Sequence, residues 1–124
     1  MRRFLVLISI LAVCLVAGCG GGVKTYVDPE KPISIRIEKE FIIALDSNPT
    51  TGYDWEESYD ESVLKLVDDR YEQDEKAEGL VGAGGTQYFQ FKALKAGQTE
   101  ITFVYKRSWE TDFLEQKVFT VNIK

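Results

Sequence analysis

Three short segments combine residues that stiffen a backbone with side chains suited to contact another molecule. They are Asn48-Pro49-Thr50-Thr51-Gly52-Tyr53, Leu80-Val81-Gly82-Ala83-Gly84-Gly85 and Arg107-Ser108-Trp109-Glu110. Pro49 fixes its own φ and disfavours helix at Asn48, whereas glycine tolerates positive φ and the close approach of another backbone. A tryptophan in a polar loop is typical of an interface. These features favour recognition by rigid loops over bond-making chemistry.

Each segment also has an interpretation without a partner. Asn48 can bond its own backbone two residues on and Gly52 can take positive φ, which describes a turn between two strands. The glycine-rich segment could be a flexible hairpin tip, and Trp109 could cap the end of the core. A phosphate-binding loop is excluded, because neither a helix nor a Lys-Ser or Lys-Thr pair follows the glycines. The residues alone leave the choice between turn and contact loop open.

Catalytic and metal-binding chemistry has few candidate residues. The chain has no histidine and two cysteines, Cys14 and Cys19, so histidine-assisted nucleophiles and Cys/His zinc sites are excluded. An acidic run offers oxygen ligands for calcium, but its spacing matches no calcium loop and favours a solvated acidic face. The run comprises Asp68, Asp69, Glu72, Asp74, Glu75 and Glu78. We therefore predict a protein that is not an enzyme and uses no metal and no cofactor.

The N-terminal residues predict export and a lipid anchor. Arg2 and Arg3 precede an uncharged run over residues 4–16, which leads into Ala17-Gly18-Cys19. Such a run reaches only ~20 Å at ~1.5 Å per residue, too short for a hydrocarbon core of ~30 Å but typical of a cleaved signal. The end of the run resembles a bacterial lipobox, which implies a signal peptide over residues 1–18 and lipid on the sulfur of Cys19. We expect the chain at the surface of the cell membrane or outer membrane, with a plain secretory signal as the alternative.

Beyond residue 18, the composition describes one acidic domain. The remaining 106 residues (124 minus 18) carry 13 basic and 20 acidic side chains, a net charge of −7 (13 minus 20). Nucleic acid is therefore an unfavourable partner. With Cys19 lipidated no disulfide can form, but a domain of this size can bury enough apolar surface without one. We expect a monomer in which residues 19–32 form a flexible tether to a domain over residues 33–124.

Short strands with period-two alternation must position the three segments. Ile33, Ile35 and Ile37 alternate with polar residues, and residues 41–45 form a short apolar run typical of a core strand. Further strands are predicted over 53–59, 63–67, 88–93, 101–106 and 119–124, with 68–79 as an exposed connection or an edge strand. The turn at Lys95-Ala96-Gly97-Gln98 predicts a hairpin. About seven strands without a helix predict an all-β, immunoglobulin-like sandwich with no disulfide.

Taken in order, the three segments resemble the chagasin family of cysteine peptidase inhibitors. The matching motifs are Asn-Pro-Thr-Thr-Gly-aromatic at 48–53, Gly-x-Gly-Gly at 82–85 and Arg-x-Trp at 107–109, and the similarity runs from about residue 33 to residue 124. The resemblance implies an immunoglobulin-like fold in which three loops at one end enter the active-site cleft of a papain-like cysteine peptidase. It implies reversible occlusion, with no scissile bond placed for attack.

The resemblance also implies a role for each segment. Thr50 and Thr51 would lie over the catalytic cysteine and histidine of the peptidase. Residues 80–85 would follow the non-primed side, and Arg107 and Trp109 would pack on the primed side. The family usually has proline where this chain has Ser108, so we expect binding weaker by the ~0.4–1 kcal/mol that such a proline contributes. A non-inhibitory adhesion or assembly module on the cell surface, with the same fold, is the alternative function.

Overall fold

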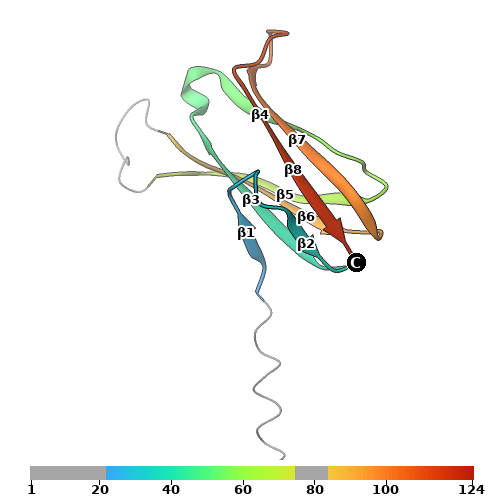
Figure 1. Ribbon diagram of the computed structural model, residues 1–124. Coiled ribbons are helices and arrows are strands. Elements are labelled where there is room, and N and C mark those ends of the chain that lie inside the picture. Colours follow the sequence, from blue (N-terminus) through green and yellow to red (C-terminus); the bar gives the residue numbers. More distant parts are fainter. Residues whose placement is uncertain (1–21, 75–83) are drawn as a thin grey trace, which may run out of the picture.

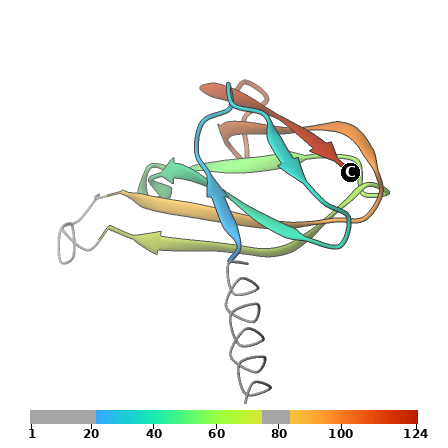
Figure 2. The same ribbon diagram turned by 60° about the horizontal axis from the view of Figure 1, so that its bottom comes forward.

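The protein is a sandwich of two four-stranded sheets (Figure 1). The computed structural model describes residues 22–74 and 84–124. The strands are β1 (Lys24–Tyr26), β2 (Ile33–Ile35), β3 (Glu40–Ser47), β4 (Tyr53–Ser58), β5 (Leu64–Gln73), β6 (Gly85–Ala93), β7 (Gly97–Arg107) and β8 (Glu115–Ile123). One sheet has the order β1-β3-β6-β5 and the other β2-β8-β7-β4. Figure 2 shows the two layers, with β8 in red above β5 and β6 in yellow tones.

The core forms where inward side chains of the two sheets meet. Phe89 and Phe91 of β6, Phe103 of β7 and Phe119 of β8 are fully buried. Phe103 lies at the centre, with its ring centroid 4.8 Å from that of Phe89 and 5.7 Å from that of Phe119. The predicted all-β sandwich is confirmed. The described residues contain no cysteine and therefore no disulfide, so apolar packing holds the two sheets together.

The predicted tether is partly ordered, which corrects the expectation for residues 19–32. Residues 24–26 form β1, which pairs in parallel with β3 from Lys24 opposite Phe41 to Tyr26 opposite Ile43. The Tyr26 ring packs edge to face on Phe41, with centroids 6.3 Å apart. The polar composition misled the prediction, because one aromatic contact and a short ladder attach this segment to the sheet edge.

The turn after β6 does not close a hairpin, contrary to the prediction. β6 pairs with β3 and β5, whereas β7 lies in the other sheet between β8 and β4. The amide of Leu94 donates to the carbonyl of Val63 at 2.8 Å, and Gly97 takes a φ of 140°, so the chain crosses from one sheet to the other. Alternation on both sides of a turn predicts two strands, but it does not decide whether they pair or stack face to face.

Two other strand boundaries differ from the expected ones. The strand from Ile33 ends at Ile35, and Ile37 is exposed, because Glu38 turns the chain with a φ of 75°. The acidic residues 68–73 belong to β5, so the edge-strand alternative is the correct one there. Within the described residues, no helix is long and apolar enough to cross a membrane.

Candidate functional site

The first and third segments meet at one end of the sandwich, where β3 leads into β4 and β7 leads into β8 (Figure 1). β4 pairs with β7, so Tyr53 lies opposite Arg107. The Arg107 Nε donates to the carbonyl of Thr51 at 3.4 Å. Its guanidinium lies 4.5 Å from the centroid of the Tyr53 ring, a cation–π contact. The third segment is therefore held against the first by backbone pairing and by one arginine.

A single 3-10 turn, Pro49–Thr51, shapes the first segment. Asn48 before it has φ −137° and ψ 85°, outside the helical region that proline disfavours for the residue preceding it. Gly52 ends the turn with a φ of 86°, which confirms the predicted positive φ, and its amide donates to the Pro49 carbonyl at 3.0 Å. The Asn48 side chain differs from the prediction, because its Oδ1 accepts a hydrogen bond from the Thr50 hydroxyl at 2.5 Å. The turn brings that hydroxyl within reach in place of a backbone amide.

Trp109 projects from the end of the sandwich, so the interpretation of this residue as a core cap is wrong. Its side chain is 71% exposed, whereas Trp55 is 4% exposed and donates its Nε1 hydrogen to the Asp46 carbonyl at 2.8 Å. Trp55 already fills the end of the core. The Trp109 ring lies against Gly52, where a Cβ would be 2.9 Å from the Cη2 of the ring. Glycine at position 52 thus serves both the turn and the tryptophan.

The end of the glycine-rich segment lies against the residues that lead into the 3-10 turn. A Cβ on Gly84 would lie 3.1 Å from the Ser47 carbonyl oxygen and 3.7 Å from the Asn48 Cβ. A Cβ on Gly85 would collide with the Glu72 carbonyl oxygen, so glycine here permits the close approach of β5 within the protein itself. Leu80, Val81 and Gly82 lie outside the described residues, as does Cys19. The structure therefore brings Asn48–Tyr53, Gly84, Gly85, Arg107 and Trp109 together, with the 3-10 turn in the middle.

Tyr105 of β7 supports this arrangement and was missed by the sequence prediction. Its hydroxyl accepts a hydrogen bond from the Asn48 amide at 3.0 Å. Its ring stacks on Tyr53 at 5.4 Å and contacts Trp55 at 4.8 Å between centroids. The stack continues to Arg107, which lies over Tyr53. In the sequence, Tyr105 is one residue of an ordinary alternating strand. Its hydrogen bond to Asn48 becomes evident only from the pairing of β7 with β4.

Replacing Tyr105 with phenylalanine should loosen the first segment while leaving the core intact. The ring stack is kept, but the hydrogen bond to the Asn48 amide is lost, and such a bond contributes about 0.5–1.5 kcal/mol. We expect the affinity of these loops for a binding partner to fall about 2- to 10-fold, mainly through faster dissociation. Binding kinetics and thermal melting measure the two effects separately. A lower melting temperature with unchanged binding would assign the hydroxyl to folding alone.

A group of carboxylates lies along β4, with Asp69 of β5 nearby in the other sheet. Partial burial raises the pKa of Asp54, with an opposing hydrogen bond from the Trp55 amide and further increases from the charges of Asp69 and Glu56. Burial also raises the pKa of Glu57, and the charges of Asp69 and Asp54 add to the effect. The ionised forms of these two side chains are therefore disfavoured in the folded protein.

Neutralising Glu57 should stabilise the protein at neutral pH. Because folding raises its pKa above the ordinary value of 4.5, the contribution of Glu57 to stability is fully present below the unfolded pKa and is lost as the pH rises through the folded pKa. Glu57→Gln should therefore melt at a higher temperature than the parent at pH 7, and the difference should shrink toward zero below pH ~4. An exposed control, Glu100→Gln, should show a smaller change. An equal gain at both pH values would contradict the assignment.

The acidic run of β5 does not form a metal site in the described residues. Arg70 lies between Asp68 and Glu72, with N–O distances of 3.1 and 3.0 Å. Asp69 points to the other face and accepts a hydrogen bond from Gln87 Nε2 at 2.9 Å. Strand alternation thus divides the run between two faces. No group of three or more His, Cys, Asp or Glu side chains is placed to hold a metal ion in the part of the chain that the structure describes.

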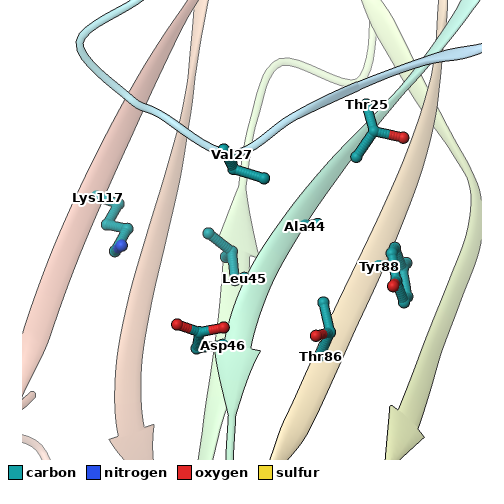
Figure 3. Close-up of a pocket in the computed structure, with 8 residues that line it drawn as sticks. All are labelled: Thr25, Val27, Ala44, Leu45, Asp46, Thr86, Tyr88 and Lys117. Carbon is teal, nitrogen blue, oxygen red and sulfur yellow. The ribbon is translucent and has the colours of Figure 1, made fainter. Parts of the chain in front are cut away.

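A hollow of about 340 Å³ lies beside β1, β3 and β6 (Figure 3). Its polar side chains include Thr25, Thr86, Asp46 and Lys117. Lys117 is engaged with the carboxylate of Glu115, at an N–O distance of 3.6 Å. Since the chain has no histidine, these hydroxyls lack the usual general base. The hollow has the lining of an ordinary surface depression.

The chain is similar in sequence and in fold to known peptidase inhibitors. Chagasin of Trypanosoma cruzi is 35% identical over 88 residues, which cover 66% of this chain and 77% of that protein. Amoebiasin-1 of Entamoeba histolytica is 32% identical over 81 residues, covering 65% of this chain and 76% of its own. The crystal structure of the cysteine protease inhibitor EhICP2 from Entamoeba histolytica superposes with a TM-score of 0.70 at 26% identity, covering 85% of this chain and all of the other. Residues 34–123 match the family described as "Chagasin family peptidase inhibitor I42". The chain therefore belongs to the chagasin family of peptidase inhibitors, and it is not an enzyme.

Proposed function

We propose that this inhibitor of papain-like cysteine peptidases blocks the active-site cleft of its target with one end of the sandwich, the three-loop surface. This surface comprises Asn48–Tyr53, Gly84-Gly85 and Arg107–Trp109, together with residues 80–82, which lie outside the described residues. The observation that carries the proposal is the direct contact of the first segment with both others: Arg107 and Trp109 lie against Thr51 and Gly52, and Gly84 lies against Ser47 and Asn48 just before the 3-10 turn. Because these contacts exist in the free inhibitor, little ordering entropy is lost on binding.

The conformation of the central loop supports occlusion without cleavage. Thr50 and Thr51 lie in a 3-10 turn, whereas a peptide bond that a peptidase cleaves is presented in an extended strand. The Thr51 hydroxyl donates to the Asn48 carbonyl at 2.7 Å, which holds the turn closed. We propose that Thr50 and Thr51 lie over the catalytic residues of the peptidase, that residues 80–85 follow the non-primed side, and that Arg107 and Trp109 pack on the primed side.

Titration against papain tests this function. We expect residues 19–124, with Cys19→Ser to prevent lipidation, to abolish papain activity near a one-to-one ratio. The inhibitor recovered from the complex should be uncleaved by mass spectrometry. Full papain activity at a large excess of inhibitor would favour the adhesion or assembly module, and stoichiometric cleavage within residues 48–53 would make the loop a substrate.

We also propose that Cys19 carries lipid and that the chain is exported to the outer face of a membrane. The support is the sequence itself: Arg2 and Arg3, the apolar run and the small residues before Cys19. Expressed in a bacterium with labelled palmitate, the full chain should incorporate label and partition into detergent. Cys19→Ser should do neither. If the Cys19→Ser chain were labelled, the lipid would have to be attached to another residue. If the parent were unlabelled, the N-terminal residues would be a plain secretory signal.

A further inference from the structure

Three of the exposed large hydrophobic side chains of the described residues lie together in the loop between β7 and β8. Trp109, Phe113 and Leu114 are 71, 52 and 66% exposed. The other large hydrophobic side chains that are exposed are spread over β5, the N-terminal residues and separate turns. Exposed apolar side chains that stand singly are normal, whereas a group of them marks an interaction surface.

The fold prevents Phe113 and Leu114 from turning inward. The core beneath the loop is already filled, since Trp55, Phe103 and Phe119 are buried. The Leu114 amide donates to the Tyr105 carbonyl at 2.7 Å, and the Glu110 amide donates to the Arg107 carbonyl at 3.0 Å. The loop is thus tied to β7 at both of its ends, and its apolar side chains stay outside in the free protein.

The position of the pair continues the three-loop surface. Arg107 and Trp109 leave β7 and contact the turn that precedes β4. Phe113 and Leu114 lie on the returning arm of the same loop, which leads into β8, and β8 is on the side of β7 away from β4. The spatial order along this end of the molecule is therefore the 3-10 turn, then Trp109, then the apolar pair Phe113 and Leu114.

The charges around the pair indicate which surface it fits. Asp112 adjoins it on one side and Glu115 on the other, and Glu110 lies 3.9 Å from Arg107 in an exposed ion pair. An apolar centre with a polar rim is the usual composition of a contact patch, and here the rim residues named are acidic. A partner with carboxylates at this position would be repelled.

We propose that Phe113 and Leu114 form a fourth contact of the inhibitor, which binds an apolar area of the peptidase beside the primed end of its cleft. This inference rests on the proposed function of the three-loop surface. It assigns the pair a role in selecting among peptidases: enzymes with an apolar surface at this place are bound more tightly than enzymes with an acidic one.

The double variant Phe113→Ser/Leu114→Ser tests the pair in the full exported chain. We expect its inhibition constant against papain to rise about 10- to 100-fold, as for the loss of two buried apolar side chains. The matched control Val27→Ser/Leu94→Ser removes two exposed apolar side chains elsewhere and should stay within about twofold of the parent. Thermal melting checks that each variant is folded, and Leu114→Ala alone replaces the double variant if that one is not.

The outcomes separate this inference from the proposed function. A parent chain that does not inhibit papain overturns both. A parent that inhibits, together with a folded double variant of equal potency, overturns only the fourth contact. A concentration-dependent dimer that the double variant abolishes, with inhibition unchanged, would assign the apolar pair to self-association and overturn it as well.

Discussion

Replacing Trp109 with alanine should raise the inhibition constant against papain about 100- to 1,000-fold, the effect of losing a central interface tryptophan. In the free inhibitor this side chain is 71% exposed, so most of its apolar surface becomes buried only when a partner binds. Among the described residues, its ring lies against Gly52 and beside the Arg107 guanidinium. We therefore expect the loss to appear in the dissociation rate of the complex, with only a small change in melting temperature.

Two control variants sharpen this test. Trp109→Phe keeps an aromatic ring and should recover much of the lost affinity. Leu94→Ala removes apolar surface in the turn between β6 and β7 and should leave inhibition unchanged. If Trp109→Ala inhibited papain as well as the parent while Leu94→Ala did not, the binding end would have to be assigned to the opposite pole of the sandwich.

Replacing Phe103 with alanine should have the largest effect on stability. Its ring lies 4.8, 6.5 and 5.7 Å from those of Phe89, Phe91 and Phe119, so it joins the two sheets at their centre. A buried phenylalanine truncated to alanine costs about 3–5 kcal/mol, a large part of the 5–15 kcal/mol that stabilises a typical domain. We expect a fall in melting temperature of about 15–30 °C and a lower urea midpoint.

The same substitution should leave the binding surface intact at low temperature. Phe103→Leu, which leaves a smaller cavity, should lose less stability. Where the alanine variant is still folded, its inhibition constant should be close to that of the parent, because the ring partners of Phe103 are the core residues Phe89, Phe91 and Phe119. A loss below about 1 kcal/mol would mean that the two sheets are held together elsewhere.

Alternation made most of the strands predictable. The buried residues of β6, β7 and β8 fall at every second position, with Ile101 and Phe103 as the buried pair of β7, and this period of two is visible in the sequence. Which strands pair with one another was harder to predict from the sequence. The turn around Lys95 connects two sheets, and residues 24–26 add a parallel strand, because both depend on contacts far away in the chain.

The candidate site was predictable where its residues have unusual types. Pro49, Gly52 and Trp109 are noticeable in the sequence because proline, glycine and tryptophan have specific physical uses in loops. Tyr105, Phe113 and Leu114 are not, since tyrosine, phenylalanine and leucine are ordinary in a β protein. Their roles follow from the register of β7 with β4 and β8, which places a hydroxyl at the Asn48 amide and leaves two apolar side chains in solvent.

The parallel pairing of β1 with β3 sets the direction in which a lipidated molecule would face. β3 runs from Glu40 toward the 3-10 turn, and β1 joins it at Phe41, so the chain attaches at the pole remote from the loops. Lys24 lies five positions after Cys19 (24 minus 19), a span of at most ~17 Å. Because this connection is short, the sandwich would lie close to the bilayer. The three-loop surface would then point away from the membrane, at a distance set by the ~27 Å length of β3. A peptidase diffusing past the cell would meet this surface before it met the lipid headgroups.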